Sequence, residues 1–214
     1  MKKFELISEF VTNVFGKKLF RIKALVSFGD VSAGELGGFV EKEENLSNNG
    51  NAWVSGNAQV SGNAQVSDNA RVSGNAQVSG DAQVSDNAWV SGNAWVSGNA
   101  RVSGDAWVSG DALVSGNAQV SDNARVSGNA QVSGDADFSV VTGFGRFFRA
   151  TTFFRCKDKI LRVQCGCFYG DLAKFREIVK KTHGDSKYAK EYLAIADLME
   201  LHFSDEEENQ EADK

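Results

Sequence analysis

The sequence contains no long hydrophobic run and few cysteines. No stretch of about 18 consecutive apolar residues, the length that a membrane-spanning helix needs, occurs in the chain. The N-terminal segment MKKFELISEF carries acids where a secretory signal would need an apolar stretch. The chain has three cysteines, Cys156, Cys165 and Cys167. This small, odd number does not provide a disulfide framework. We therefore expect a cytosolic protein with free thiols and no membrane partner.

A dominant charge is also missing from the body of the chain. The formal net charge is −5, and the acidic C-terminal segment SDEEENQEADK accounts for all of it. The other segments alternate in sign: residues 1–24 sum to +4, 25–50 to −4, 51–139 to −5 and 140–203 to +5. This is not the continuous basic stripe of a nucleic-acid-binding protein, so nucleic acid is not an expected partner. A hydrophobic content of 42% is enough for a core.

A six-residue phrase fills the middle of the chain. Asn/Asp-Ala-x-Val-Ser-Gly/Asp occurs in fifteen consecutive copies from Asn51 to Val140, and the last copy is degenerate, with Phe138 in the Val position. In an extended segment the Ala and Val of each copy point to one side and x points to the other. Ser-Gly-Asn supplies a corner, because Gly and Asn tolerate left-handed backbone angles. We therefore expect Ala and Val to face inward and x to face solvent.

The period of the phrase predicts the architecture. Three short strands close a triangular coil of 18 residues. Successive coils then stack at about 4.7–4.9 Å, and each backbone pairs with the coil before and after it. The expected fold class is mainly β, a left-handed parallel β-helix of about five to six coils.

The quoted phrases also carry a family resemblance. Tandem Ala-x-Val-Ser-Gly-Asn resembles the hexapeptide-repeat left-handed β-helix superfamily over residues 51–139. The phrases AGELGGFVEKEENLSNNGNAWV and VQCGCFYGDLAKFREIVKKTHGDSKYAKEYLAIADL are similar to uncharacterised phage and prophage proteins often labelled polymer-forming or hexapeptide-repeat. The resemblance spans nearly the whole chain and implies the β-helix, but it implies little about function.

The phase of the repeat continues upstream and sets the domain boundaries. Val40 and Leu46 are six apart and fall in inward slots, as does Glu44, and two corner residues are inserted within Asn48–Gly50. We predict an N-terminal β cap at residues 1–37, the β-helix at 38–140, a C-terminal α+β cap at 141–203 and an acidic disordered tail at 204–214.

Caps are expected because the open ends of a β-helix invite further stacking. Residues 3–28 predict a hairpin around Phe15 and Gly16. The phrases RFFRATTFFRC and ILRVQCGCF predict two strands joined at Lys157–Lys159.

Two helices are expected after this second hairpin. The first runs from an N-cap at Asp171 to about Thr182 and stops at Gly184, and the second runs from near Ser186 to about Phe203. Their apolar stripes are Leu172, Phe175, Ile178 and Val179 in the first helix, and Tyr188, Tyr192, Ile195 and Met199 in the second.

The scarcity of histidine bears on catalysis. The best-known enzymes of the hexapeptide superfamily are acyltransferases, which use a histidine near the coils as a general base. This chain has no histidine before His183, and both His183 and His202 fall in the C-terminal cap, where capping or surface roles are favoured. We therefore expect no catalytic residue, no cofactor and no enzyme activity.

The cysteines and aspartates are weak candidates for a metal site. Cys165 and Cys167 share one strand face with Leu161 and Val163, which favours burial, and two cysteines without nearby ligands fall short of a zinc site. Three aspartates fall on one corner of the triangle. A weak cation site is possible there, but we favour a role in solubility or a salt bridge to an arginine three residues further along the chain. These aspartates are Asp68, Asp86 and Asp122, and the arginines are Arg71 and Arg125.

The variable x slot carries the most information about binding. Every eighteenth residue falls on the same face of the triangle, so the slots form three faces, and all four tryptophans lie in outward slots. An exposed aromatic patch on a rigid face is typical of an interface, whereas Trp and Arg could also stack on each other and serve only the coils. The predicted interaction face is Trp53, Arg71, Trp89, Trp95, Trp107, Leu113 and Arg125.

Self-association is the leading interpretation of this face. Side-by-side trimers are common in the superfamily that the repeat resembles, and closed symmetry suits one adhesive face per subunit. We expect a homo-oligomer, with a trimer favoured and Trp89, Trp95 and Trp107 near the contact. A different partner, such as a host protein, stays open.

Three classes of function follow. The first is a non-enzymatic phage or prophage binding protein in the host-cell cytoplasm that engages a host factor, for example as a host-defence antagonist. The second is a structural or virion-associated assembly module, although capped ends and an acidic tail oppose open polymerisation. The third is an atypical hexapeptide acyltransferase, which the absence of a histidine in the coils disfavours. We favour the first class.

Overall fold

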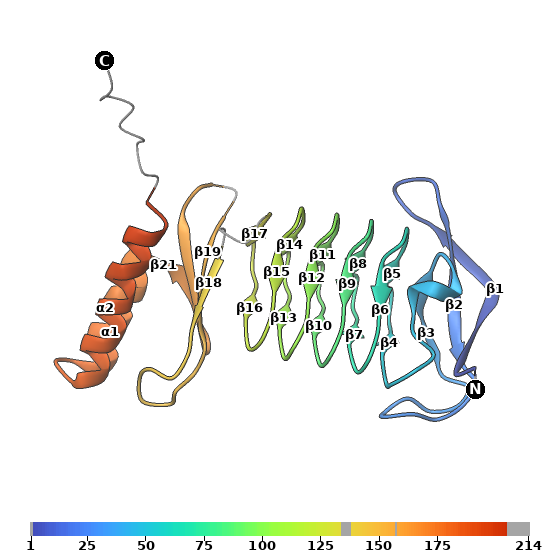
Figure 1. Cartoon of the computed structure of the whole chain (residues 1–214), viewed down its shortest axis with the longest axis horizontal. Helices are drawn as coiled ribbons and strands as arrows, with labels where there is room; N and C mark the ends of the chain where they lie inside the picture. The colour runs from blue at the N-terminus through green and yellow to red at the C-terminus, as the bar shows by residue number, and fades with distance from the viewer. Residues whose placement is uncertain (1, 134–137, 157, 205–214) are drawn as a thin grey trace, which may run out of the picture.

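A computed structural model describes residues 2–133, 138–156 and 158–204. Figure 1 shows an elongated molecule with three parts in chain order: an N-terminal sheet, a shaft of stacked coils, and a C-terminal sheet covered by two helices. The parallel β-helix predicted from the repeat is confirmed. Throughout, "shaft" means the coils from residue 51 to residue 133.

The shaft consists of two-residue strands that pair in three ladders. The first ladder contains β4 (Trp53–Val54), β7 (Arg71–Val72), β10 (Trp89–Val90), β13 (Trp107–Val108) and β16 (Arg125–Val126). The second contains β5 (Gln59–Val60), β8 (Gln77–Val78), β11 (Trp95–Val96), β14 (Leu113–Val114) and β17 (Gln131–Val132). The third contains β6 (Gln65–Val66), β9 (Gln83–Val84), β12 (Arg101–Val102) and β15 (Gln119–Val120).

The core of the shaft is made of the repeated alanines and valines. Each of them from Ala52 to Val132 is at most 1% exposed, as the inward assignment predicted. Burial of one valine side chain contributes about 1.5–3 kcal/mol, so the repeat stabilises the shaft at every turn. Backbone hydrogen bonds run from N–H groups of one coil to carbonyls of the next, for example from Trp89 to Ala106 at 2.9 Å.

The N-terminal cap is a sheet continuous with the second ladder. The strands β1 (Phe4–Thr12), β2 (Lys18–Ala24) and β3 (Leu36–Val40) are antiparallel neighbours, and β3 then pairs in parallel with β5. The predicted hairpin around Gly16 is confirmed, and its turn is held by Asn13, whose side-chain oxygen accepts from the N–H groups of Phe15 and Lys17.

The segment between β3 and β4 corrects one sequence prediction. A short 3₁₀ helix, η1 (Glu43–Asn45), shifts the phase of the chain by one side chain. Glu44, expected inward, is exposed, whereas Asn45 is fully buried; Val40 and Leu46 are inward as predicted. A carboxylate without a partner is costly to bury, and an amide is acceptable there because it forms hydrogen bonds.

The C-terminal cap is a four-stranded antiparallel sheet with two helices. Its strands are β18 (Phe138–Val141), β19 (Thr151–Arg155), β20 (Leu161–Cys165) and β21 (Phe168–Asp171), and its helices are α1 (Leu172–His183) and α2 (Lys187–His202). The predicted pairing of two strands across residues 157–159 is confirmed, but two further strands flank them. Neither described helix is long and apolar enough to cross a bilayer.

The junction between shaft and C-terminal cap also differs from the prediction. Phe138, placed by the repeat in a fifteenth coil segment, instead belongs to β18 and pairs with Phe154 of the cap sheet. Both helices begin and end close to the predicted residues, with side-chain N-caps from Asp171 and Ser186 and a C-cap at Gly184. The helices pack on the cap sheet through Phe153, Phe175 and other apolar side chains.

Candidate functional site

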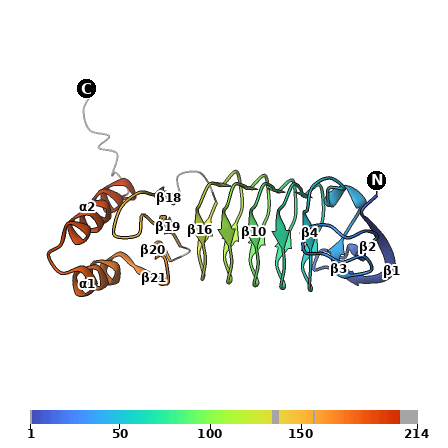
Figure 2. The same ribbon diagram turned by 90° about the horizontal axis from the view of Figure 1, so that it is seen from below.

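The first ladder presents one outward residue per coil, in register. Trp53, Arg71, Trp89, Trp107 and Arg125 are neighbours in successive coils, as the spacing of 18 residues predicted. We call the outward surface of β4, β7, β10, β13 and β16 face one. Figure 2 views the molecule from the side of this face, with β4, β10 and β16 toward the viewer.

The centre of face one is a stack of two tryptophans and an arginine. The rings of Trp89 and Trp107 are 5.3 Å apart and within 8° of parallel, and the guanidinium of Arg125 lies 5.2 Å from the Trp107 ring. Each indole N–H donates to a serine of the preceding coil, Ser73 or Ser91. Trp89 is nevertheless 44% exposed, so an apolar ring surface with its polar atom already satisfied faces solvent.

The N-terminal end of face one is covered, which narrows the predicted interaction face. Trp53 was expected in the exposed face, but it is only 2% exposed because Phe28 packs against it edge-on at 5.5 Å. Arg71 was expected to pair with Asp68, and it instead pairs with Asp30 from the loop between β2 and β3. We call that loop, residues 25–35, the N-loop.

The C-terminal end of face one is bounded by a second loop, residues 142–150, which we call the C-loop. It exposes Phe147 and Phe148, with 61% and 71% of their surface accessible, and Arg146 and Arg149 lie 5.4 and 5.0 Å from the Phe147 ring. A cavity of about 800 Å³ separates this loop from the coils and is lined by Arg125, among others. In Figure 1 the N-loop and the C-loop both project beyond the coils on the side of face one.

Sequence reasoning missed the C-loop. The phrase RFFR was assigned to a strand, whereas β19 begins only at Thr151. The available signal was the pair Gly143 and Gly145, both of which adopt positive φ angles and interrupt the extended chain.

The second ladder carries the remaining predicted interaction residues on a different face, which we call face two. Trp95 is half-buried, its indole N–H donates to Ser79, and its ring lies 6.3 Å from Phe15 at the tip of the N-terminal hairpin. Phe15 and its neighbour Val14 are 62% and 76% exposed. Leu113 follows Trp95 in the ladder and is half-buried. The outward residues of the third ladder, Gln65, Gln83, Arg101 and Gln119, form a polar third face. By the repeat, Asp137 would fall on the same face, and it lies outside the described residues.

An acidic corner borders face one. Asp68, Asp86 and Asp122 have φ angles of 57–59°, in the left-handed region that glycine occupies at most other corners. At the intervening coil Gly104 holds this place, and Asp105 follows it. The Asp86 carboxylate accepts from the Gly104 N–H at 3.0 Å, so the corner side chains bond to the next coil. Among the described residues no cluster of three His, Cys, Asp or Glu side chains could hold a metal ion.

Side chains close the N-terminal end of the shaft. Within the shaft, alanine and valine carbonyls of one coil accept from N–H groups of the preceding coil. In the first coil, the carbonyls of Ala58, Val60 and Val66 accept from backbone N–H groups of the N-terminal segment, and other carbonyls accept from side chains. The ammonium of Lys3, only 3% exposed, donates to the carbonyls of Ala52 at 2.9 Å and Gly50 at 3.4 Å. Burial lowers the pKa of Lys3 to about 8, with a smaller contribution from the charge of Arg71.

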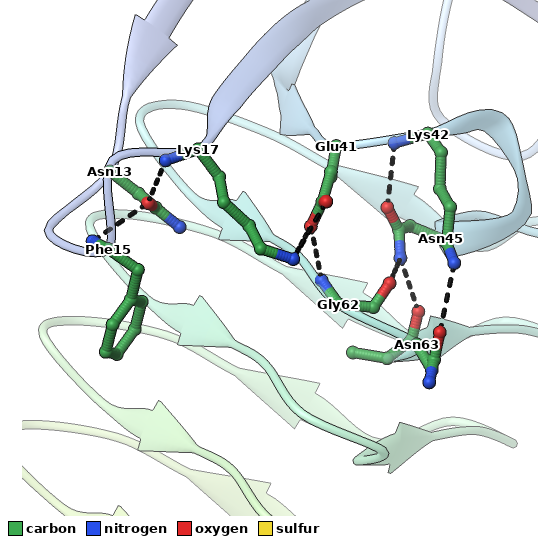
Figure 3. Close-up of polar contacts among 9 residues, drawn as sticks. Asn13, Phe15, Lys17, Glu41, Lys42, Asn45, Gly62 and Asn63 are labelled. Atoms are coloured by element: carbon green, nitrogen blue, oxygen red, sulfur yellow. Dashed lines mark hydrogen bonds and ion pairs between the residues drawn. The ribbon is translucent and has the colours of Figure 1, made fainter.

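The third ladder is closed at the same end by Asn45 (Figure 3). Its amide N–H groups donate to the carbonyls of Ala64 at 2.8 Å and Gly62 at 3.1 Å, and its oxygen accepts from the Lys42 N–H. Beside it, the Glu41 carboxylate accepts from the Gly62 N–H at 2.7 Å. Burial opposes ionisation of Glu41, but hydrogen bonds from Gly62 and Lys17 outweigh it and lower its pKa.

The C-terminal end of the shaft is closed by a hydrogen-bond acceptor, whereas the N-terminal end is closed by side-chain donors. After the last described coil, the C-terminal cap supplies an acceptor for a backbone N–H group. The Arg125 N–H donates at 3.1 Å to the hydroxyl oxygen of Thr152, which is fully buried in β19. The Ser127 hydroxyl donates to the side-chain oxygen of Gln164 at 2.7 Å. Both ends of the shaft are therefore covered by the chain's own side chains.

The histidines, Cys165 and Cys167 lie away from the coils, whereas Cys156 is buried and forms a β-bridge with Ala130 of the last coil. His183 stacks at 5.8 Å on Tyr192 between the two helices, and His202 lies at the end of α2. Cys165 is half-buried in β20 as expected. Cys167 was expected on the same apolar strand face, but it is exposed, because Gly166 with φ 59° ends the strand in a tight turn.

The shaft matches a known protein family. Residues 52–142, which are less than half of the chain, match the family model Bactofilin, described as polymer-forming cytoskeletal. A comparison with curated proteins gives no match.

This match corrects the expected function. A polymer-forming cytoskeletal family does not fit a phage protein that binds a host factor, and that expectation is wrong. The virion-associated and acyltransferase alternatives gain no support from the match either, whereas self-association agrees with it. The coils of this chain are therefore similar to the bactofilin domain, a polymer-forming cytoskeletal β-helix.

Proposed function

We propose that this chain is a non-enzymatic structural protein that assembles with further copies of itself through the sides of its shaft. The observation that carries the proposal is the match of the shaft to a polymer-forming family. The Trp89–Trp107 stack, exposed on one side of this shaft, provides a surface for such assembly. Exposed aromatic patches on rigid surfaces are typical of protein interfaces, because water contact with such rings is unfavourable.

Growth through the sides is favoured over growth through the ends. Addition of one shaft onto another would require free backbone groups at the end coils. At the first coil Lys3 and Asn45 already bond to these carbonyls, and at the last coil Thr152 accepts from an N–H group. Replacement of these contacts would gain little, since each new bond would cost an existing one.

A polymer needs two contact surfaces on each copy, and the shaft has two aromatic sides. Face one carries the tryptophan stack, and face two carries Trp95 beside the exposed hairpin tip with Phe15 and Val14. One self-complementary surface alone would give a closed dimer, whereas two different surfaces allow a ring or an extended assembly. The trimer expected from the superfamily would be such a ring.

A purely structural role agrees with the positions of the reactive side chains. The histidines lie in the C-terminal helices and pack on aromatic rings, and neither lies on the coils. The described lining of the cavity near Arg125 contains a carboxylate, Asp105, and a hydroxyl, Thr142, but no histidine.

Sedimentation velocity of the full chain over a range of concentrations tests the proposal. We expect masses above the 23.1 kDa of one chain, increasing with concentration. Trp89→Ala combined with Trp107→Ala should shift the assembly toward smaller species. The matched control is Gln83→Ala with Gln119→Ala, which changes the same slots on the third face. A wild-type chain that stays a monomer at every concentration would refute the proposal.

A further inference from the structure

The two loops that flank face one carry opposite charges. The N-loop, LVSFGDVSAGE, contains Asp30 and Glu35 and no basic residue, and the C-loop, TGFGRFFRA, contains Arg146 and Arg149 and no acidic residue. All four side chains are exposed. Face one therefore has an acidic boundary at one end and a basic boundary at the other.

The charges in both loops are available to a partner. The Asp30 side chain pairs with Arg71 but keeps 78% of its surface accessible. The Glu35 carboxylate accepts from the N–H of Ser32 within its own loop and pairs with no basic side chain among the described residues. In the C-loop the backbone of Phe148 has a φ of 51°, a region that bulky residues rarely adopt, and its ring is 71% exposed. Such strain at an exposed aromatic residue is a feature of binding sites.

We propose that face one binds a second copy of this chain in antiparallel orientation, about a two-fold axis near the Trp89–Trp107 stack. In this arrangement the C-loop of each copy meets the N-loop of the other. A parallel arrangement would place two C-loops together and two N-loops together, and like charges brought together disfavour a complex. The inference rests on the proposed function and specifies its geometry.

The centre of the face suits a two-fold axis. The strand β10, which carries Trp89, is the middle of the five strands in the ladder, and each loop borders one end. A two-fold axis that lies in the contact plane, perpendicular to the shaft, places the ladder of the second copy face to face with that of the first, with its ends exchanged. The exposed rings of the two copies then bury one another, and each residue pair occurs twice, as in other isologous dimers.

The acidic corner argues for a second copy over an anionic surface. Alone, the C-loop with its phenylalanines and arginines would also suit an anionic lipid surface or a nucleic acid. However, Asp68, Asp86, Asp105 and Asp122 border the same face, and the N-loop adds further acids. An anionic surface broad enough to cover face one would meet these carboxylates, whereas a second copy brings an acidic loop to a basic one.

Charge exchange in the full chain tests the orientation. Arg146→Glu with Arg149→Glu should weaken self-association at low salt by about tenfold or more, because both loop contacts become repulsive. Adding Asp30→Lys and Glu35→Lys in the same chain should restore association to about the wild-type level, because the loops are again opposite in charge. In a parallel pair the first variant would have no such effect. The measurement is the dissociation constant from sedimentation.

Controls separate the two levels of the hypothesis. Arg101→Glu reverses an exposed arginine on the third face and should leave association unchanged. Circular dichroism melting reports folding; if the fourfold variant melts early, Arg149→Glu with Glu35→Lys repeats the test without disturbing the Asp30–Arg71 pair. A wild-type chain that is monomeric overturns the proposed function and this inference together. A wild-type chain that associates, but whose association ignores the loop charges or is not restored by their exchange, overturns only this inference.

Discussion

The ammonium of Lys3 lies 2.9 Å from the carbonyl oxygen of Ala52 and is almost completely buried. A residue at the start of the chain thereby completes the hydrogen bonding of the first coil, which starts some fifty residues later. Lysine is rarely buried without a carboxylate partner. At this position the ammonium loses hydration and gains hydrogen bonds to the backbone carbonyls of the first coil.

The first prediction concerns the pH dependence that Lys3 brings. Its pKa is about 8 in the folded chain and about 10.5 when unperturbed, so between these values the unfolded chain binds more protons. The free energy of unfolding contributed by Lys3 should therefore rise as the pH increases from about 8 to about 10. Urea unfolding of the wild type and of Lys3→Met at both pH values tests this: the unfolding free energy of the wild type should gain more from about pH 8 to about pH 10 than that of the variant. Parallel pH profiles of the two proteins would contradict it.

The second prediction concerns Asn45. Asn45→Leu keeps a similar volume but removes both donors to the Gly62 and Ala64 carbonyls and leaves the Lys42 N–H without its acceptor. Each buried polar group left without a partner costs about 1–3 kcal/mol, so the unfolding free energy should fall by several kcal/mol. Asn49→Leu, at an exposed position nearby, is the matched control and should change stability by less than about 0.5 kcal/mol. Equal effects of the two substitutions would show that Asn45 does not close the ladder.

The coils could be predicted from the sequence because every local preference in the repeat agrees. Ala and Val alternate with x, glycine or aspartate occupies each left-handed corner, and the period returns each slot to the same face after 18 residues. The alignment of Trp89 with Trp107 follows from that period alone. No long-range information is needed, since each coil repeats the last.

The ends and the site boundaries could not be predicted in the same way. Burial of Trp53 depends on Phe28, and closure by Lys3 depends on a sheet whose pairing joins residues far apart in the chain. The same x slot is exposed at Trp89 and buried at Trp53, so the slot determines direction but not exposure. The inward position of Asn45 was missed because a 3₁₀ turn changed the phase of the repeat.

The third prediction concerns the close approach of successive corners. A Cβ atom at Gly80 would lie 2.9 Å from the backbone nitrogen of Gly98, and Gly80 has a φ of 71°. Gly80→Ala should therefore cost the strain of a left-handed conformation, about 1–2 kcal/mol, and a further cost from displacing the next coil. Gly34→Ala, with a φ of 87° and no atom within 4 Å of the new Cβ, should cost only the strain. Urea unfolding of both variants measures the difference, and equal losses would contradict the tight spacing of the coils.

The last prediction separates the stability of the tryptophan stack from its role in assembly. Offset parallel aromatic pairs contribute about 0.5–1.5 kcal/mol beyond their burial. A double-mutant cycle of Trp89→Ala and Trp107→Ala, measured by unfolding at a concentration where the chain is monomeric, should give a coupling energy in that range. Because the stack is partly exposed and rests on a shaft with its own core of alanines and valines, the variants should stay folded. The free energy of self-association lost in these variants should then exceed the coupling energy between the two rings, because the exposed ring surface that a partner covers is also removed. A coupling of zero would mean that the two indoles do not stack in solution, and unchanged association would mean that face one is not the contact.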